Sequence, residues 1–386
     1  MIYIKNGKIL TMADRIYEKG CILIDKGKIV DVGEEIIAPP QAEVIDAEGL
    51  FVMPGIIDAH CHIGMWEDSI GAAGADGNEK TNPITPQLRA IDGINPMDKT
   101  FTEAYEAGVT TAMTGPGSAN VIGGEFAIIK TYGKRIDDMI MKAPAAMKVA
   151  FGENPKVFYG DKGKTPQTRM ATAAILREIL MKAADYKAKK ERGRENPEKM
   201  PDKDIRLEAL LPVLNKEIPL KAHAHRADDM FTAIRISKEF DVKITLDHVT
   251  EGHLIIDELL AENIPLIVGP SFGMRSKVEL REASFKTPGL LSKAGLKIAI
   301  TTDHPVMPLK YLTMCAAYAV KEGMKEEEAL KAITINAAEI IGIADRVGSI
   351  APGKDGDIVI FDGNPLEIKS KSMYVLINGE IIFKRA

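Results

Sequence analysis

Two pairs of histidines have the spacing in this sequence that best suits chemistry. His60 and His62 close an apolar stretch that begins at Phe51, and His223 and His225 close a second one. With 7 His among 386 residues, random placement gives roughly 0.13 His-x-His pairs per chain, so two pairs need a common cause. Residues two apart on a β-strand point to the same face. Each pair is therefore expected to present two imidazoles at one strand end, where they can bind one metal ion.

Two further side chains follow apolar runs in the same way. His248 follows the run 242–247, and Asp303 follows the run 297–302. Three or four imidazoles and one carboxylate form a ligand set suited to a zinc-like divalent ion with one position open to water. Such an ion acidifies a bound water molecule and polarises a carbonyl, and a neighbouring carboxylate can take up the proton. The sequence thus predicts a metal-assisted hydrolytic site.

These side chains require elements that bring distant parts of the chain together. From about residue 54 to residue 345, β-type runs alternate with helical patterns, which predicts βα units and a parallel sheet. The predicted fold class is α/β, and eight strand candidates match the number that closes a (β/α)8 TIM barrel, whose catalytic groups project from the C-terminal strand ends. The candidates are the segment that ends at His62, then 109–113, 126–130, 145–150, 219–224, 242–247, 265–269 and 297–302.

Helical patterns occupy most of the intervals between these strands. Asn95-Pro96 and Thr165-Pro166 are expected to open two helices, because an N-cap residue precedes proline at the first helical position. Charges of mixed sign crowd the run 187–203, which we interpret as a solvated helix end and loop. Further helices are expected over 207–214, 228–240, 253–262 and 288–294.

The two ends of the chain have a different pattern. Short β-type runs there alternate with turn signals, including Asn6-Gly7 and Lys26-Gly27, which favours hairpins of a small antiparallel sheet. We therefore expect residues 1–52 and 347–386 to form one small composite β-sandwich domain. Residues 53–346 are expected to form the barrel.

The net charge and the cysteine content argue against several classes of protein. The net charge of −5 and pI of about 5.9 give no basic surface, so nucleic acid and anionic membranes are not expected partners. The three cysteines are odd in number and have no paired spacing, which fits a reducing compartment. The N-terminus does not resemble a signal peptide, and no apolar run reaches ~18 residues. We expect a cytoplasmic protein that acts on a small molecule, and homo-oligomer formation is left open.

Taken together, the strand-end motifs resemble those of the amidohydrolase superfamily, and the resemblance covers nearly the whole chain. Within it, the sequence is most similar to the branch of imidazolonepropionases and Xaa-Pro-type dipeptidases. The segment 54–62 resembles the first-strand signature, and 220–225, 244–248 and 300–303 resemble the ends of strands five, six and eight. The segments 333–338 and 348–359 resemble the closing part of the family's chain.

The resemblance implies a role for each of these residues. It makes His60 and His62 ligands of the more buried metal, and Asp303 both a ligand and the general base. His223 and His248 would bind a second metal, or one would bind and the other would face substrate in a mononuclear centre. The implied cofactor is one or two divalent ions, with Zn2+ as the expected metal. His225 becomes a neighbour of the site or a substrate contact.

Binuclear members of the family also bridge their metals with a carboxylated lysine from strand four. Lys148 lies on the predicted fourth strand and is the candidate. Lys130 lies in a similar setting on a neighbouring strand, and Glu153 offers a carboxylate instead, so the number of metals stays open. Arg226 and Arg275 follow strands five and seven and are candidates for binding a substrate carboxylate, because a guanidinium offers two parallel donors.

Three activities compete within this family, and a non-catalytic member of it is the alternative from another function class. Hydrolysis of a C–N bond by a dipeptidase or N-acyl amino acid hydrolase is placed ahead of an imidazolonepropionase-like ring opening. A deaminase ranks third, because the helix-borne His-x-x-Glu of deaminating members is not found. A non-catalytic scaffold is disfavoured, because His60, His62 and Asp303 are all retained. Asp58, on the same strand face, is expected to form a structural ion pair.

Overall fold

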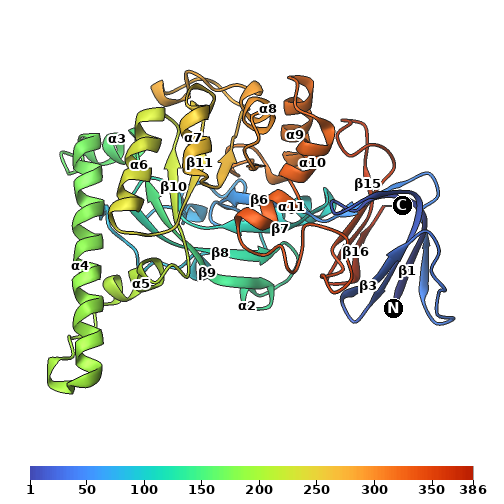
Figure 1. Ribbon diagram of the computed structural model, residues 1–386, viewed down its shortest axis with the longest axis horizontal. Helices are drawn as coiled ribbons and strands as arrows, with labels where there is room; N and C mark the ends of the chain where they lie inside the picture. The colour runs from blue at the N-terminus through green and yellow to red at the C-terminus, as the bar shows by residue number, and fades with distance from the viewer. Residues whose placement is uncertain (386) are drawn as a thin grey trace.

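The computed structural model describes residues 1–385 and contains two eight-stranded sheets. One sheet collects strands from both ends of the chain, and the other takes its strands from the middle (Figure 1). Both termini lie beside the first of these sheets, at one end of the molecule (Figure 1). Within residues 1–385, no helix combines the length and apolar character needed to cross a membrane.

The terminal sheet has the strand order β16-β15-β14-β5-β1-β2-β3, and β4 pairs with β1. Its hairpin turns at Lys26-Gly27 and Asn378-Gly379 have positive φ at both residues, as tight hairpins require. The predicted turn at Asn6-Gly7 is wrong, since these residues lie inside β1 at a register shift. Its strands are β1 (Ile2–Leu10), β2 (Ile16–Asp25), β3 (Lys28–Gly33), β4 (Glu43–Asp46), β5 (Phe51–Pro54), β14 (Ile358–Phe361), β15 (Ser372–Ile377) and β16 (Glu380–Lys384).

The central sheet has the order β13-β12-β11-β10-β9-β8-β7-β6. All eight predicted strands are present, and the ladder nearly closes into a barrel, with the His62 N–H donating to the His304 carbonyl at 2.8 Å across the remaining seam. The strands are β6 (Ile56–Cys61), β7 (Val109–Thr114), β8 (Ile122–Lys130), β9 (Ile140–Ala150), β10 (Leu220–Ala224), β11 (Ile244–His248), β12 (Leu266–Val268) and β13 (Ile298–Ile300).

The prediction that every barrel strand is parallel is wrong for β8. This strand pairs antiparallel with both β7 and β9, whereas the other ladders of the sheet are parallel. A parallel crossover needs a dozen or more residues, and the segment between Thr114 and Ile122 is shorter and contains no helix. The fold is therefore a mixed α/β barrel sheet in which one strand is reversed.

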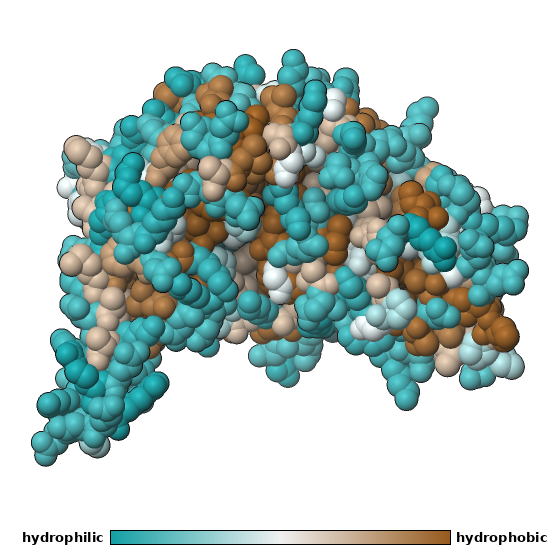
Figure 2. Space-filling model, in the orientation of Figure 1, coloured by the Kyte–Doolittle hydropathy of each residue, from teal (hydrophilic) through white to brown (hydrophobic). Residues whose placement is uncertain are grey.

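The helices cover the outside of the central sheet (Figure 1). The longest, α4, begins after Thr168, whose side chain accepts from the N–H of Ala171 at 3.1 Å, three residues later than predicted. Its far end, in the predicted charged run, is covered by hydrophilic side chains (Figure 2). The α-helices are α1 (Lys99–Glu106), α2 (Ile136–Met139), α3 (Glu153–Gly160), α4 (Arg169–Glu195), α5 (Ile205–Leu214), α6 (Ala227–Glu239), α7 (Ile256–Glu262), α8 (Lys286–Lys293), α9 (Leu312–Lys321), α10 (Glu326–Ala332) and α11 (Ile335–Ile340).

The chain passes from one sheet to the other at Gly55. The apolar stretch from Phe51 to His62 is divided at the Pro54-Gly55 corner, because β5 belongs to the terminal sheet and β6 to the central one. A Cβ atom at Gly55 would lie 2.0 Å from the Thr110 hydroxyl oxygen, so only glycine fits this crossing. The junction fixes where β6 starts and hence where His60 and His62 lie.

A buried ion network ties the two sheets together. The ammonium of Lys130, on β8, lies 2.6 Å from Asp357 and 3.0 Å from Asp355, and all three side chains are buried. Although burial alone would raise the pKa of Asp355, the charge of Lys130 and the contacts with Lys28 and Arg346 lower it. Lys130 is thus engaged with the terminal sheet rather than with the histidines.

Substitution of Lys130 tests this network. We expect Lys130→Met to lower the free energy of unfolding by about 3–5 kcal/mol, because it leaves the buried Asp357 carboxylate without a cation, while Asp355 keeps Lys28 and Arg346. Urea unfolding followed by circular dichroism measures the change. Lys182→Met is the control, since its ion pair with Glu178 is exposed on α4, and we expect a loss below about 0.5 kcal/mol. Equal losses in the two variants would contradict the proposed role of the network.

Candidate metal centre

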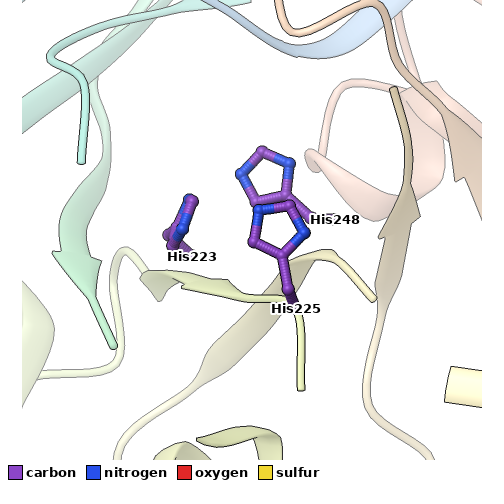
Figure 3. Close-up of side chains that lie close together, drawn as sticks. All are labelled: His223, His225 and His248. Atoms are coloured by element: carbon purple, nitrogen blue, oxygen red, sulfur yellow. The ribbon is translucent and has the colours of Figure 1, made fainter. Parts of the chain in front are cut away.

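Two clusters of side chains lie at the C-terminal ends of the barrel strands. In each cluster one ligand atom from every member lies within 4.8 Å of the others, which is close enough for one ion. In each cluster, two of the three side chains come from one His-x-His pair at a single strand end, as the spacing predicts. The first cluster comprises His60, His62 and Asp303, and the second comprises His223, His225 and His248, whose rings face one another in Figure 3.

The first cluster joins β6 to the end of β13. The Nε2 atoms of His60 and His62 lie 3.4 Å and 3.1 Å from Oδ1 of Asp303. Asp303 has φ of 52°, a left-handed conformation that turns its carboxylate toward the histidines. Burial would raise the pKa of this carboxyl, but the facing imidazoles of His248, His60 and His62 hold it well below the usual range. The carboxylate is therefore ionised and able to bind a cation.

The second cluster is packed from three imidazoles. The ring centroid of His248 lies 4.4 Å from that of His223 and 4.5 Å from that of His225. His248 and the following Val249 have φ of 78° and 50°, so the chain is strained at the end of β11. His248 also lies 4.0 Å from Oδ2 of Asp303, which places the second cluster directly beside the first.

The outer ring nitrogens of several histidines are already engaged. His62 and His248 donate from Nδ1 to the carbonyls of Gly115 and Gly269 at 2.7 Å and 2.8 Å. His225 Nδ1 lies 2.7 Å from the hydroxyl of Thr250. Such contacts fix the ring and leave Nε2 free to bind a metal. The donor set fits a divalent ion.

Burial keeps the imidazoles neutral, the form that binds metal. It lowers the pKa of His60 to about 4 and that of His225 to about 3. Both ring nitrogens of His60 are buried without a well-aligned hydrogen bond, although Nδ1 lies 3.1 Å from Asp247. The buried His60 ring therefore lacks a polar partner, and a cation bound at Nε2 would provide one.

Lys148 lies on β9 beneath the clusters and is fully buried. Its ammonium has no hydrogen-bond partner among the described residues, and Asp247 lies 3.5 Å away. Burial lowers the pKa of Lys148 to about 8. Asp247 has a second cation, because Lys221 lies 3.1 Å from its other oxygen and also donates to the Ala59 carbonyl at 3.0 Å. Lys148 is thus an unsatisfied amine within the site.

Asp58 holds the barrel seam together below the metal cluster. Its two oxygens accept from the backbone N–H groups of His60 and Thr302, each at 3.0 Å, and from the Thr302 hydroxyl at 2.6 Å. The Thr301 hydroxyl lies 2.8 Å away. Burial raises the pKa of Asp58, and these donors oppose the increase. The expected ion pair was wrong, because hydroxyls and amides are its partners, and through them it fixes the approach to Asp303.

The two arginines proposed for substrate binding lie in different surroundings. Arg226 makes a two-point contact with Asp228 at 3.0 Å and 2.9 Å. Arg275 is exposed and donates to the Ala283 carbonyl at 3.1 Å. Neither contact joins the guanidinium to the histidines, so a role in substrate binding stays a prediction. His225 was expected as a neighbour or substrate contact, and it lies within the second cluster.

Sequence reasoning missed a polar group that faces the second cluster. Glu279 follows β12 in a short 3-10 helix, Val278–Leu280, and its Oε1 lies 3.7 Å from Nε2 of His223 and 3.9 Å from Nε2 of His225. Burial would raise its pKa, but the two imidazoles and a backbone amide lower it to about 2. Lys277 lies 3.7 Å from the same oxygen, and the side-chain amide of Asn154 lies 3.3 Å from Nε2 of His223. No periodicity marks this segment, so only its place after the seventh strand offered a signal.

Comparisons with known proteins agree with this geometry. The profile of the amidohydrolase family matches residues 51–382. The chain belongs to the amidohydrolase family. A crystal structure of an amidohydrolase from Thermotoga maritima MSB8 superposes with a TM-score of 0.97 at 42% identity over all of both chains.

Curated relatives of this amidohydrolase have several names. It is 29% identical to amidohydrolase tasK of Hapsidospora irregularis over 94% of the chain, and it spans only 40% of that protein's length. It is 23% identical to an imidazolonepropionase of Fusobacterium nucleatum subsp. nucleatum, over 96% of the chain and 93% of the relative. The family follows from the profile match along most of the chain.

The seam at Asp58 generates a stability prediction. We expect Asp58→Asn to lower the free energy of unfolding by about 2–4 kcal/mol, because an amide nitrogen replaces an acceptor that faces buried donors. Guanidinium unfolding of the purified protein measures the loss. Thr301→Ser keeps the hydroxyl and removes one methyl group, so about 1 kcal/mol is expected there. A smaller loss in Asp58→Asn than in Thr301→Ser would rule out this role for Asp58.

Proposed function

We propose that this amidohydrolase is a metal-dependent enzyme that hydrolyses an amide C–N bond of a small molecule. The observation that carries the proposal is the meeting of two histidine clusters at one carboxylate, Asp303. Such a site is built for charge stabilisation and proton transfer at one reacting carbonyl. A dipeptide or an N-acyl amino acid is the proposed substrate class.

The proposed ligands are the residues that the family resemblance assigns. His60, His62 and Asp303 would hold one divalent ion, and His223 and His248 a second, with Zn2+ as the proposed metal because imidazole and carboxylate donors suit it. When bound, the metal supplies Lewis-acid polarisation of the substrate carbonyl and acidification of water. The fit rests on neutral, buried imidazoles and on an ionised Asp303.

We further propose that Lys148 is carboxylated and that its carbamate would be a further ligand for the ions held by the two clusters. The uncharged amine would add to CO2, so that a C–N bond forms while one C=O π bond becomes a C–O⁻ bond, and the nitrogen would lose one proton to water, which gives a carbamate with one negative charge. The support is a buried Nζ without a partner and a pKa lowered to about 8 by burial. Asp247 would lose the positive charge of Lys148 but would still pair with Lys221, whose ammonium lies 3.1 Å away.

Asp303 is the proposed proton carrier. Its carboxylate is ionised and 15% exposed, so it can reach a water molecule that attacks the carbonyl. It would accept the proton from this water and pass it to the leaving nitrogen as the C–N bond breaks. Arg226 and Arg275 remain the proposed partners of a substrate carboxylate.

A ring-opening activity on a cyclic amide is the second candidate. It is favoured by the match to an imidazolonepropionase along nearly the whole length of both chains. Two further proposals rest on the sequence analysis. They are a cytoplasmic enzyme without nucleic-acid or membrane partners, and a small β domain built from residues 1–52 and 347–386, which is supported by the separate apolar cluster of the terminal sheet.

Kinetics of the Zn2+-loaded enzyme test the proposal. We expect turnover of at least one dipeptide, N-acyl amino acid or cyclic amide, loss of turnover after chelation, and recovery on addition of Zn2+. Asp303→Asn should lower kcat by about 10²–10⁴-fold, because the proton carrier is removed. Lys182→Met serves as the control and should keep wild-type kcat. Unchanged turnover in Asp303→Asn with metal still bound would refute the proton transfer.

A further inference from the structure

Glu279 is a buried carboxylate that the proposed reaction does not use. Its side chain is 1% exposed, and Oε2 accepts from the backbone N–H of Glu153 at 3.0 Å. Its other oxygen, Oε1, is buried without a hydrogen-bond partner among residues 1–385. A buried carboxylate oxygen without a partner costs free energy. Oε1 therefore needs a partner that the described side chains do not provide.

The direction of Oε1 indicates the kind of partner. It faces Nε2 of His223 at 3.7 Å and Nε2 of His225 at 3.9 Å, which is too long for hydrogen bonds. Donor atoms of a tetrahedral zinc site with bonds of about 2.0–2.2 Å lie about 3.3–3.6 Å apart. The first cluster has comparable spacing, since His60 Nε2 lies 3.4 Å from Asp303. The two distances from Oε1 of Glu279 are slightly longer than this range, so a small shift of its side chain would bring the carboxylate and both imidazoles around one ion.

We infer that Glu279 is a metal ligand and completes a second site with His223, His225 and His248. The inference rests on the proposed metal-dependent function and changes the role of His225 from substrate contact to ligand. Three neutral imidazoles and one carboxylate give four donors for a divalent ion, to which a carboxylated Lys148 would add a fifth. The Nδ1 contact of His225 with Thr250 leaves its Nε2 available for this purpose.

An ion pair with Lys277 is the competing explanation for Glu279. The Lys277 ammonium lies 3.7 Å from Oε1, but its side chain is 40% exposed and it also donates to Asn154 Oδ1. A partly exposed pair at this distance contributes little. If Lys277 were the reason for the buried carboxylate, then Lys277→Met would disturb the site as strongly as a change at Glu279.

Zinc binding to the full-length protein separates these explanations. We expect two equivalents of Zn2+ in the wild type by elemental analysis. Competition with a chromophoric chelator should show that Glu279→Gln and His225→Gln each weaken the second equivalent at least tenfold. Lys277→Met should retain both equivalents. Substitution by Co2+ adds a visible spectrum, which should change in Glu279→Gln because its ligand set changes.

Glu251 provides a matched control. It is 4% exposed, its Oε2 accepts from the Ala227 N–H at 2.9 Å, and its Oε1 lacks a hydrogen bond, but its neighbour is Arg281 at 3.3 Å rather than an imidazole. Glu251→Gln should keep both equivalents. If Glu279→Gln does not fold, Glu279→Asp keeps the charge and withdraws the oxygen by one methylene, and it should weaken the same equivalent.

Each contrary result has a definite meaning. Wild-type affinities in both Glu279 variants would overturn the inference, and so would weakening in Glu279→Gln without weakening in His225→Gln, since Glu279 would then only orient His223. One equivalent of zinc in an active wild-type enzyme would overturn the inference and leave the proposed function intact. Absence of bound zinc together with absence of turnover would refute the proposed function itself.

Discussion

The position of the Asp303 carboxylate is the constraint on which the rest of the site depends. Oδ1 faces His60 and His62, and Oδ2 faces His248, so one side chain joins two clusters whose members come from four strand ends. This requires β13 to end beside β6 although no strand ladder joins the two. Asp58 provides the connection by binding Thr301 and Thr302, the two residues directly before Asp303. The left-handed backbone of Asp303 then aims the carboxylate inward.

A second constraint is the group of charged side chains that is buried in the barrel interior. Asp247, Lys148 and Lys221 are all at most 1% exposed, and they lie beneath the histidines. Lys221 satisfies one oxygen of Asp247, while the other faces both Lys148 and Nδ1 of His60. Removal of one member of such a group leaves an uncompensated charge in a low dielectric. The charges that support the site therefore also tie it to the stability of the barrel.

Much of this arrangement is predictable because alternation and strand-end position are local properties. The pairing of His60 with His62, and the convergence of His223, His248 and Asp303, follow from period-2 geometry and from the common edge of parallel strands. The sequence also distinguishes barrel strands from terminal hairpins, since helical patterns separate only the former.

The remaining features depend on tertiary contacts that leave no local pattern. The reversal of β8 follows from the short connection after Thr114, and the two-sheet division of the segment 51–62 depends on a glycine packed against Thr110. Glu279 comes from a single 3-10 turn between β12 and α8, and the N–H of Glu153 holds its carboxylate beside the histidines. The sequence could not decide whether Lys130 or Lys148 lies in the site. The structure decides it, because Asp355 and Asp357, which lie next to β14 of the terminal sheet, pair with Lys130.

The central claim is that the two histidine clusters form a metal centre joined by Asp303. Crystals grown with Zn2+ and measured at the zinc absorption edge test this claim most directly. The account predicts an anomalous peak enclosed by His60, His62 and Asp303 and a second enclosed by the imidazoles of the other cluster. A map with no anomalous peak at either cluster, in crystals where these side chains are well ordered, would contradict it.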